Sequence, residues 1–323
     1  MNKIKILLAI LTLIFVITAC SQVKEAKLES ISVATLKGPT SMGISKMIFD
    51  KEKVDGLDIN YEIYATPDLV VTKLLNNEID IAAVPTNVAA NIYNKTEGKY
   101  KILDVNTLNV LYVVAPKSMN IKSIIDLKDS TIEVSGKKTV PEYVFNYVLD
   151  KNALKDGENI KLDYSIDHTT SAQKLITGKS KIAILPQPFA TLVTMKNKDL
   201  EVKINLGDEW TKLTNTDLPM GCIVAKTELI ENHKKFINDF MSKTKESSKW
   251  VNKNIDEASI IIKDLGILTD ESIAKAAIPY CSIVYIDGKD MKASLDKFYG
   301  ILEGIDKDSI GGKVPDENIY YKK

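Results

Sequence analysis

The sequence predicts an α/β protein built from two similar lobes with a ligand cleft between them. Residues 73–89 and 174–190 align without a gap at a constant offset of 101. Each copy also follows a glycine-containing turn between an expected strand and helix, at 37–41 and 135–139. A spacing near one hundred residues is about one small domain and too long for a solenoid repeat. Two such lobes place helix N-termini around a shared crevice.

Each copy of the repeat predicts the end of a helix, a polar turn, a buried strand and the start of another helix. In the first copy, Asn76 and Asn77 interrupt a helical apolar face, and Ile81–Val84 is an unbroken apolar run. In the second copy the corresponding run is Ile182–Leu185. An apolar run that ends directly in polar capping residues is typical of a parallel strand buried on both faces.

The other elements follow from hydrophobic periodicity and capping residues. Helices are expected after Thr40 or Ser41, from Pro67 and from about Val140, where a hydroxyl or a proline suits the first turn. Further strands are expected at 31–36, 57–63, within 102–114, and at 131–134, 161–165, 201–204 and 220–225. Residues 206–219 are a polar stretch that contains Trp210, and 232–249, 256–265 and 291–302 are expected to be helices.

Residues 1–19 are expected to be a signal peptide. Lys3 and Lys5 precede an apolar run over 6–17 that is short for a membrane span. The next residues, Ile17-Thr-Ala-Cys20, resemble the lipobox of bacterial lipoproteins, in which the cysteine is lipidated. We therefore expect Cys20 to carry a lipid anchor and residues 20–29 to be a polar tether. The alternative is an ordinary cleaved signal peptide with a coincidental cysteine.

The charge pattern excludes some partners. All 43 basic residues are lysine and are balanced by 43 acidic residues, so the formal net charge is zero. A neutral chain gives no reason to expect nucleic acid as a partner. The absence of arginine removes the planar group that best holds carboxylate, sulfonate or phosphate. An anion would have to be held by lysine, hydroxyl and backbone N–H groups.

The cysteine and histidine residues predict no metal site, cofactor or catalytic motif. Cys222 and Cys281 are either paired in a disulfide or free in the core, and their apolar neighbours favour the second. His168 precedes two threonines that suit a helix start, so we expect it at the surface. The sequence has no Cys/His cluster, Gly-x-Ser-x-Gly motif or phosphate-binding loop.

Together these features resemble the solute-binding lipoproteins of ABC importers, in the family of alkanesulfonate, taurine, nitrate and thiamine-pyrimidine binding proteins. The resemblance spans residues 30–300 and is carried by residues 36–42, 77–85, 124–128 and 185–190. It implies a type II periplasmic-binding-protein fold with two chain crossings, near Val114 and Pro219. Lobe one would then be residues 30–114 plus 220–323, and lobe two would be residues 115–219.

The resemblance also implies which residues contact the ligand. Lobe one would contribute Gly38, Pro39, Thr40, Ser41, Met42, Tyr64, Pro85, Thr86 and Asn87, and lobe two would contribute Gly136, Lys137, Thr139, Pro186, Gln187 and Phe189. An aromatic or heterocyclic ligand stacked on Tyr64 or Phe189 is favoured, because arginine is absent.

The implied function is capture of a small molecule by hinge closure of a monomer, followed by delivery to a membrane permease that a separate ATPase drives. The protein would lie outside the cytoplasm, lipid-anchored to the outer face of the bacterial cell membrane. One alternative is a small anion, such as a sulfonate or nitrate, in the same role. A second is a ligand-sensing lipoprotein. A third, an enzyme on this fold, is not expected, since Lys137 and Tyr64 are the only titratable candidate cleft residues.

Overall fold

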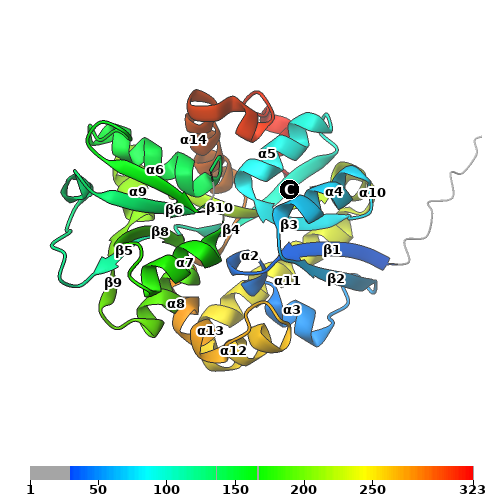
Figure 1. The fold of residues 1–323 in the computed structure, drawn as a ribbon. Coiled ribbons are helices and arrows are strands. Elements are labelled where there is room, and N and C mark those ends of the chain that lie inside the picture. Colours follow the sequence, from blue (N-terminus) through cyan, green and yellow to red (C-terminus); the bar gives the residue numbers. More distant parts are fainter. Residues whose placement is uncertain (1–29, 136, 166, 323) are drawn as a thin grey trace, which may run out of the picture.

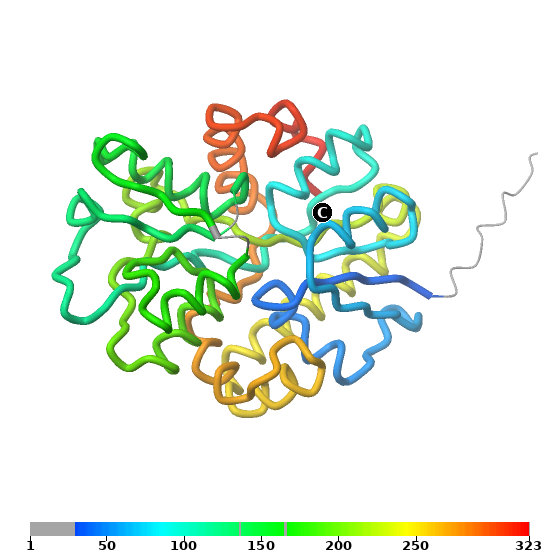
Figure 2. The backbone as a smooth tube through the Cα atoms, viewed as in Figure 1, coloured from blue at the N-terminus to red at the C-terminus, as the bar shows by residue number. Residues whose placement is uncertain are grey.

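The computed structural model describes residues 30–135, 137–165 and 167–322, which form two α/β lobes lying side by side (Figure 1). The expected signal peptide over 1–19, the tether over 20–29 with Cys20, and Gly136 lie outside the described residues. Figure 2 follows the chain from the first lobe into the second, drawn in green, and back to the first.

Lobe one contains a six-stranded sheet in the order β11-β4-β10-β3-β1-β2. Its strands are β1 (Ser30–Leu36), β2 (Asp58–Tyr64), β3 (Ile81–Pro85), β4 (Tyr100–Leu108), β10 (Pro219–Lys226) and β11 (Ile283–Ile286). Strand β1 is parallel to both β2 and β3, whereas β10 is antiparallel to both β3 and β4. The sheet is therefore mixed, and both of its antiparallel strands, β10 and β11, come from late in the sequence.

Lobe two repeats this arrangement with five strands in the order β7-β6-β8-β5-β9. They are β5 (Leu111–Pro116), β6 (Thr131–Ser135), β7 (Lys161–Ser165), β8 (Ile182–Pro186) and β9 (Leu200–Asn205). Strand β6 is parallel to β7 and β8, and β5 is antiparallel to β8 and β9. The strand order and directions match β2-β1-β3-β10-β4 of lobe one, so the two lobes share one topology.

The predicted repeat is confirmed in register as well as in topology. Strands β3 and β8 have the same length and begin 101 positions apart, at Ile81 and Ile182. Residues 81–84 and 182–185 are all at most 2% exposed, as expected for strands covered on both faces. The helices that precede these strands, α4 (Pro67–Leu75) and α7 (His168–Ile176), are also offset by 101.

The remaining helices cover the sheets (Figure 1). Before β10 they are α2 (Pro39–Met42), α3 (Ser45–Asp50), α5 (Thr86–Lys95), α6 (Val140–Lys151), α8 (Phe189–Lys196) and α9 (Leu206–Thr214). The C-terminal part contains α10 (Thr227–Asn232), α11 (Lys234–Lys253), α12 (Ile255–Asp264), α13 (Glu271–Ala277) and α14 (Gly288–Asp306).

Helix α9 lies in the polar stretch after β9, to which the sequence analysis assigned no element. The side chain of Asn205 caps the helix by accepting a hydrogen bond from the Gly207 N–H at 2.9 Å. Leu206 and Trp210 are fully buried and four residues apart, so they share one helical face. The face is short and lies among polar residues, and for this reason the sequence pattern did not reveal it.

The first crossing lies at Asn109 and Val110, earlier than the predicted crossing near Val114. Strand β4 ends at Leu108 in the first sheet, and β5 begins at Leu111 in the second. Two apolar strands joined by two residues form one continuous β-rich stretch in the sequence. The break between them was therefore placed too late.

Asn109 ties the two crossings together. Its backbone N–H donates to the Leu218 carbonyl at 3.0 Å, and its Oδ1 accepts from the Leu218 N–H at 2.9 Å. Its φ of 46° is in the left-handed region, which asparagine tolerates better than most residues. A Cβ on Gly207 would come within 2.5 Å of the Asn109 Cβ, so this close approach requires glycine.

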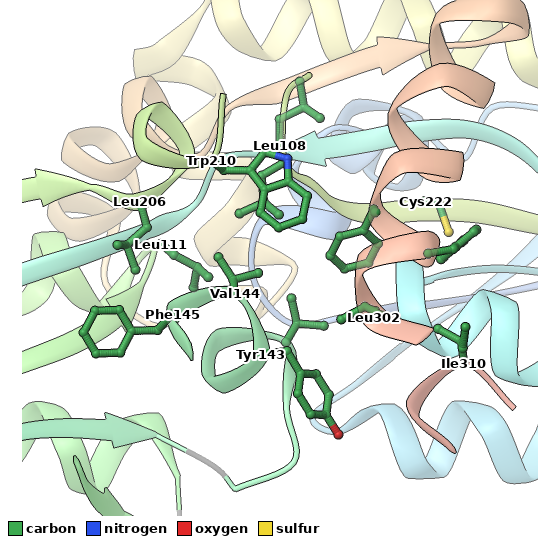
Figure 3. Close-up of a cluster of buried hydrophobic side chains, with 14 of the residues drawn as sticks. Leu108, Leu111, Tyr143, Val144, Phe145, Leu206, Trp210, Cys222, Leu302 and Ile310 are labelled. Carbon is green, nitrogen blue, oxygen red and sulfur yellow. The ribbon is translucent and has the colours of Figure 1, made fainter. Parts of the chain in front are cut away.

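A hydrophobic cluster beside the crossings joins the lobes on the side of α14 (Figure 3). The Trp210 ring packs 5.8 Å from Phe298 of α14 and 5.3 Å from Tyr147 of α6. The Tyr143 hydroxyl of α6 donates to the Asp306 carboxylate at the end of α14, at 2.7 Å. Helix α14 therefore contacts both lobes.

We expect Asn109→Ala to lower the free energy of unfolding by about 2–3 kcal/mol, measured by urea denaturation. Alanine strains the left-handed backbone and removes the hydrogen bond to Leu218. The matched control is Asn77→Ala, because Asn77 also has a left-handed φ, 66°, but an exposed side chain. If both variants lose the same stability, the side chain of Asn109 does not hold the crossings together.

Candidate ligand-binding cleft

A cavity of about 490 Å³ lies between the lobes. Its walls are the loops that follow β1, β2 and β3 in lobe one and β6, β7 and β8 in lobe two. The carboxyl ends of equivalent strands thus face each other, near the centre of the view in Figure 1. Residues at the crossings, including Val110 and Met220, complete the lining.

Nine predicted contact residues line this cavity. They are Gly38, Pro39, Thr40, Pro85, Asn87, Thr139, Pro186, Gln187 and Phe189. They come from both lobes and from both copies of the repeat. The cavity therefore lies between the strand-to-helix turns of the two repeat copies, where the sequence predicted the ligand cleft.

Ser41, Met42 and Thr86 do not line the cavity, because all three side chains are fully buried. The Ser41 hydroxyl donates to the Leu36 carbonyl at 2.6 Å, and Met42 packs in the core of lobe one. The Thr86 hydroxyl donates to the Pro219 carbonyl at 2.8 Å. These buried side chains support the loops from the protein interior.

Tyr64 and Lys137 also lie away from the cavity lining. The Tyr64 hydroxyl donates to the Glu62 carboxylate on the same strand, and the Lys73 ammonium lies 5.9 Å from its ring centroid. The ammonium of Lys137 lies 5.4 Å from the ring centroid of Tyr164. Tyr64 is therefore not placed to stack on a ligand, whereas Phe189 is.

The shape of the turn after β1 depends on a glycine and on two hydrogen bonds. Gly38 has a φ of 108°, which L side chains rarely adopt. The Thr40 hydroxyl donates to the Leu36 carbonyl at 3.4 Å, and Asn106 donates to the Thr40 carbonyl at 3.1 Å. In lobe two the Thr139 hydroxyl donates to the Ser135 carbonyl, also at 3.4 Å. Equivalent threonines thus support the two walls.

Gln187 is fixed in the turn after β8. Its backbone N–H donates to the Val110 carbonyl of the crossing at 2.9 Å. Its Oε1 accepts from the Thr191 hydroxyl at 2.8 Å and from the Thr191 N–H at 3.3 Å. With the oxygen occupied in this way, the amide NH₂ group is the part of Gln187 that can serve a ligand.

His168 corrects the expectation of a surface histidine. It is the first residue of α7, is half-buried and lines the cavity. Its Nδ1 forms a hydrogen bond with the Ser135 hydroxyl, and its ring centroid lies 5.5 Å from that of Phe189. Burial lowers the pKa of His168 below its ordinary value of 6.5, although the nearby Asp167 acts in the opposite direction.

Three further titratable side chains line the cavity: Lys37, Asp68 and Lys138. The expectation that Lys137 and Tyr64 were the only titratable residues there is therefore wrong. Lys37 and Lys138 lie in the predicted turns after β1 and β6, whereas Asp68 and His168 lie in the turns after β2 and β7, from which no contact residue was predicted. The repeat could have identified His168 as a lining residue. His168 corresponds to Pro67, and each is the first residue of a helix and lines the cavity.

The residues that the structure describes contain no group of three or more His, Cys, Asp or Glu side chains able to hold a metal ion. Cys222 and Cys281 are buried, free thiols, and burial raises the pKa of both. No helix in the described part of the chain is long and apolar enough to span a membrane.

The lowered pKa of His168 predicts a pH-dependent stability. His168 binds a proton more readily in the unfolded chain than in the folded protein. The folded protein therefore has its full stability above pH 6.5, and this contribution is lost as the pH falls from 6.5 through the lower pKa of the folded state. We expect the stability difference between wild type and His168→Gln to shrink from pH 7.5 to pH 5, by about 1.4 kcal/mol per unit of pKa lowering. Urea denaturation at both pH values measures it, and a constant difference would contradict the assignment.

Comparisons with known proteins agree on the fold. The computed structure matches a crystal structure described as an ABC transporter from Parabacteroides distasonis, with a TM-score of 0.80, 23% identity, and coverage of 91% of this chain and 99% of that chain. It matches the periplasmic aliphatic sulphonate binding protein SsuA from Escherichia coli with a TM-score of 0.74, 12% identity, and coverage of 91% and 92%.

The sequence is similar to the putative binding protein YtlA of Bacillus subtilis, at 24% identity over 274 residues, which are 82% of this chain and 79% of YtlA. The resemblance to solute-binding proteins of ABC importers is thus confirmed in the two-lobed fold. A family described as "Menaquinone biosynthesis" matches residues 48–303. The chain is therefore a member of the menaquinone biosynthesis family, built on the type II periplasmic-binding-protein fold.

Proposed function

We propose that the protein captures a small molecule outside the cytoplasm and delivers it to the membrane permease of an ABC importer. The observation that carries the proposal is the cavity walled by equivalent turns of two lobes. Two crossings connect the sheets of the lobes, one at 109–110 and one at 215–218 after α9, and this arrangement suits hinge closure around a ligand. The similarity to YtlA and to the transporter components supports this role.

The lining favours a flat, largely apolar ligand. Most of the wall is proline, aliphatic or aromatic, with Pro39, Val88, Val140, Pro186 and Phe189 contributed by both lobes. A volume of about 490 Å³ is in the range of small-molecule sites. Sulfonate or nitrate, held by Lys37, Lys138 and backbone N–H groups, is the alternative in the same role.

The proposal includes the lipid anchor. Lipidation at Cys20 would hold a monomeric binding protein at the outer face of the cell membrane, and residues 20–29 would give it reach. Mass spectrometry of the protein purified from the membrane fraction tests this. The N-terminal peptide is expected to begin at a diacylated Cys20, and an unmodified mature N-terminus would contradict it.

A thermal-shift screen tests the capture role. Pyrimidines, aromatic metabolites, sulfonates, nitrate and short peptides would each be added in excess to the purified protein. A ligand that binds the folded state at a hundredfold excess over Kd adds about 2.7 kcal/mol of stability, which is readily measured. We expect a stabilising ring compound. If nothing stabilises the protein, and denaturing it releases no bound small molecule, the capture role is wrong.

Substitutions should separate ligand binding from folding. Asn87→Ala is expected to weaken binding of the stabilising ligand several-fold at nearly unchanged stability, because Asn87 lines the cavity and is only partly buried. Leu185→Ala is expected to cost about 2–5 kcal/mol of stability, because Leu185 is 0% exposed in β8. Calorimetry and urea denaturation measure the two effects, and unchanged affinity in Asn87→Ala would mean that the ligand lies elsewhere.

A second candidate function is an enzyme that transforms the captured molecule. The family description favours a biosynthetic role. His168 in contact with Ser135, together with Asp68 and Lys138, gives the cavity groups that can exchange protons. Incubation of the protein with its ligand, followed by mass spectrometry, distinguishes the two functions. Recovery of unchanged ligand supports transport, and a changed mass supports catalysis.

A further inference from the structure

We propose that His168 and Ser135 form a fixed, uncharged hydrogen-bond donor in the lobe-two wall, which selects ring-shaped ligands bearing an uncharged acceptor. The acceptor would be a carbonyl oxygen or a ring nitrogen. The proposal rests on the proposed capture function and defines the ligand class of the same cavity.

The hydrogen bond between the two residues determines where the imidazole carries its proton. Ser135 is the last residue of β6 and is 0% exposed. Its hydroxyl contacts Nδ1 of His168 and makes no other hydrogen bond with the described residues. A buried O–H that does not donate costs about 1–3 kcal/mol, so Ser135 donates to Nδ1. The neutral ring then carries its proton on Nε2.

The second ring nitrogen is available to a ligand. Nε2 of His168 has no hydrogen-bond partner among the described residues, and the side chain lines the cavity. The ring is held between the end of β6 and Phe189, whose plane is inclined by 45° to it. A ligand ring against Phe189 would therefore lie within reach of an N–H donor of fixed direction.

Gln187 adds a second donor to the same wall. Both hydrogen bonds to its Oε1 come from Thr191, so its NH₂ group remains for the cavity. The wall of lobe two therefore offers two hydrogen-bond donors, the Nε2–H group of His168 and the NH₂ group of Gln187. An acceptor atom on a ligand can bind to either of them. A ligand group that only donates would leave them unpaired.

The charged groups around His168 do not turn it into a cation. The Asp167 carboxylate caps α7 by accepting from the Thr170 N–H at 2.7 Å. The buried Glu133 carboxylate on β6 is paired with Lys174 of α7 at 2.9 Å. Lys138, in the turn after β6, lines the same cavity, and burial lowers the pKa of His168. The donor is thus neutral near pH 7, which favours an uncharged acceptor.

The first experiment is ¹⁵N NMR of the imidazole nitrogens in the full-length protein at pH 7.5. The chain contains two histidines, so His233→Gln leaves His168 as the single signal. We expect Nδ1 to be unprotonated and Nε2 protonated, and Ser135→Ala to produce a mixture of both tautomers. A proton on Nδ1 in the wild type, or no change in Ser135→Ala, would overturn the fixed donor.

The second experiment uses three matched probes in calorimetry: 2-naphthamide, 2-naphthoate and 2-methylnaphthalene. They carry an uncharged acceptor, an anionic acceptor and no acceptor on the same ring system. We expect 2-naphthamide to bind most tightly. His168→Phe should weaken it about fivefold, as for one lost hydrogen bond, and leave 2-methylnaphthalene unchanged.

His168→Gln is the control, because its amide NH₂ restores a donor near the position of Nε2 and should recover most of the affinity. Equal losses for all three probes would indicate a packing role and overturn the proposal. Tightest binding of 2-naphthoate would overturn the uncharged acceptor. No binding of any probe, while the purified protein carries another ligand, would reject this ligand class and leave the capture function standing.

Discussion

The fold depends on pairing both edges of β3 and β8. These strands are buried on both faces, and their backbone groups have no access to water on either side. Their predecessors, β1 and β6, pair with one edge of each, and the other edge requires an antiparallel partner. That partner is β10 for β3 and β5 for β8, the two strands that follow the crossings. Completing either sheet therefore forces the chain to pass between the lobes.

The position of the cleft follows from these crossings. Parallel strands of both lobes end beside the crossing residues, so the turns after them face one another across a narrow gap. Asn109 holds the two crossings together, and the Gln187 N–H binds the carbonyl of Val110. The wall of the cavity is thus hydrogen-bonded directly to the first crossing.

The two walls are built from equivalent turns of lobes that share one topology, and they differ in their side chains. Pro67 and His168 occupy the same position, the first residue of the helix after an outer strand. Proline provides shape, whereas histidine bound to Ser135 provides a polar group of fixed direction. The chain thus combines a binding-protein fold with membership of the menaquinone biosynthesis family.

The sequence by itself determined the two-lobed α/β architecture, the repeat, most strands and nine residues of the cavity lining. These features depend on local or periodic patterns. An apolar run followed by a capping residue predicts a buried strand and a helix start whatever the distant residues are. Helix α9 was not predicted because its apolar face consists of only a few residues. The first crossing was predicted too late in the chain because β4 and β5 are nearly continuous in sequence.

Only the tertiary structure decided which side chains of each turn face the cavity. Ser41 and Thr86 point inward to bind carbonyl groups, whereas Asp68 and His168 reach the cleft from turns that the sequence did not single out. The physical reason is that a side chain's direction in a turn depends on backbone dihedrals and on distant partners. Ser135 and His168 are 33 residues apart, and packing of α7 against β6 is what brings them into contact.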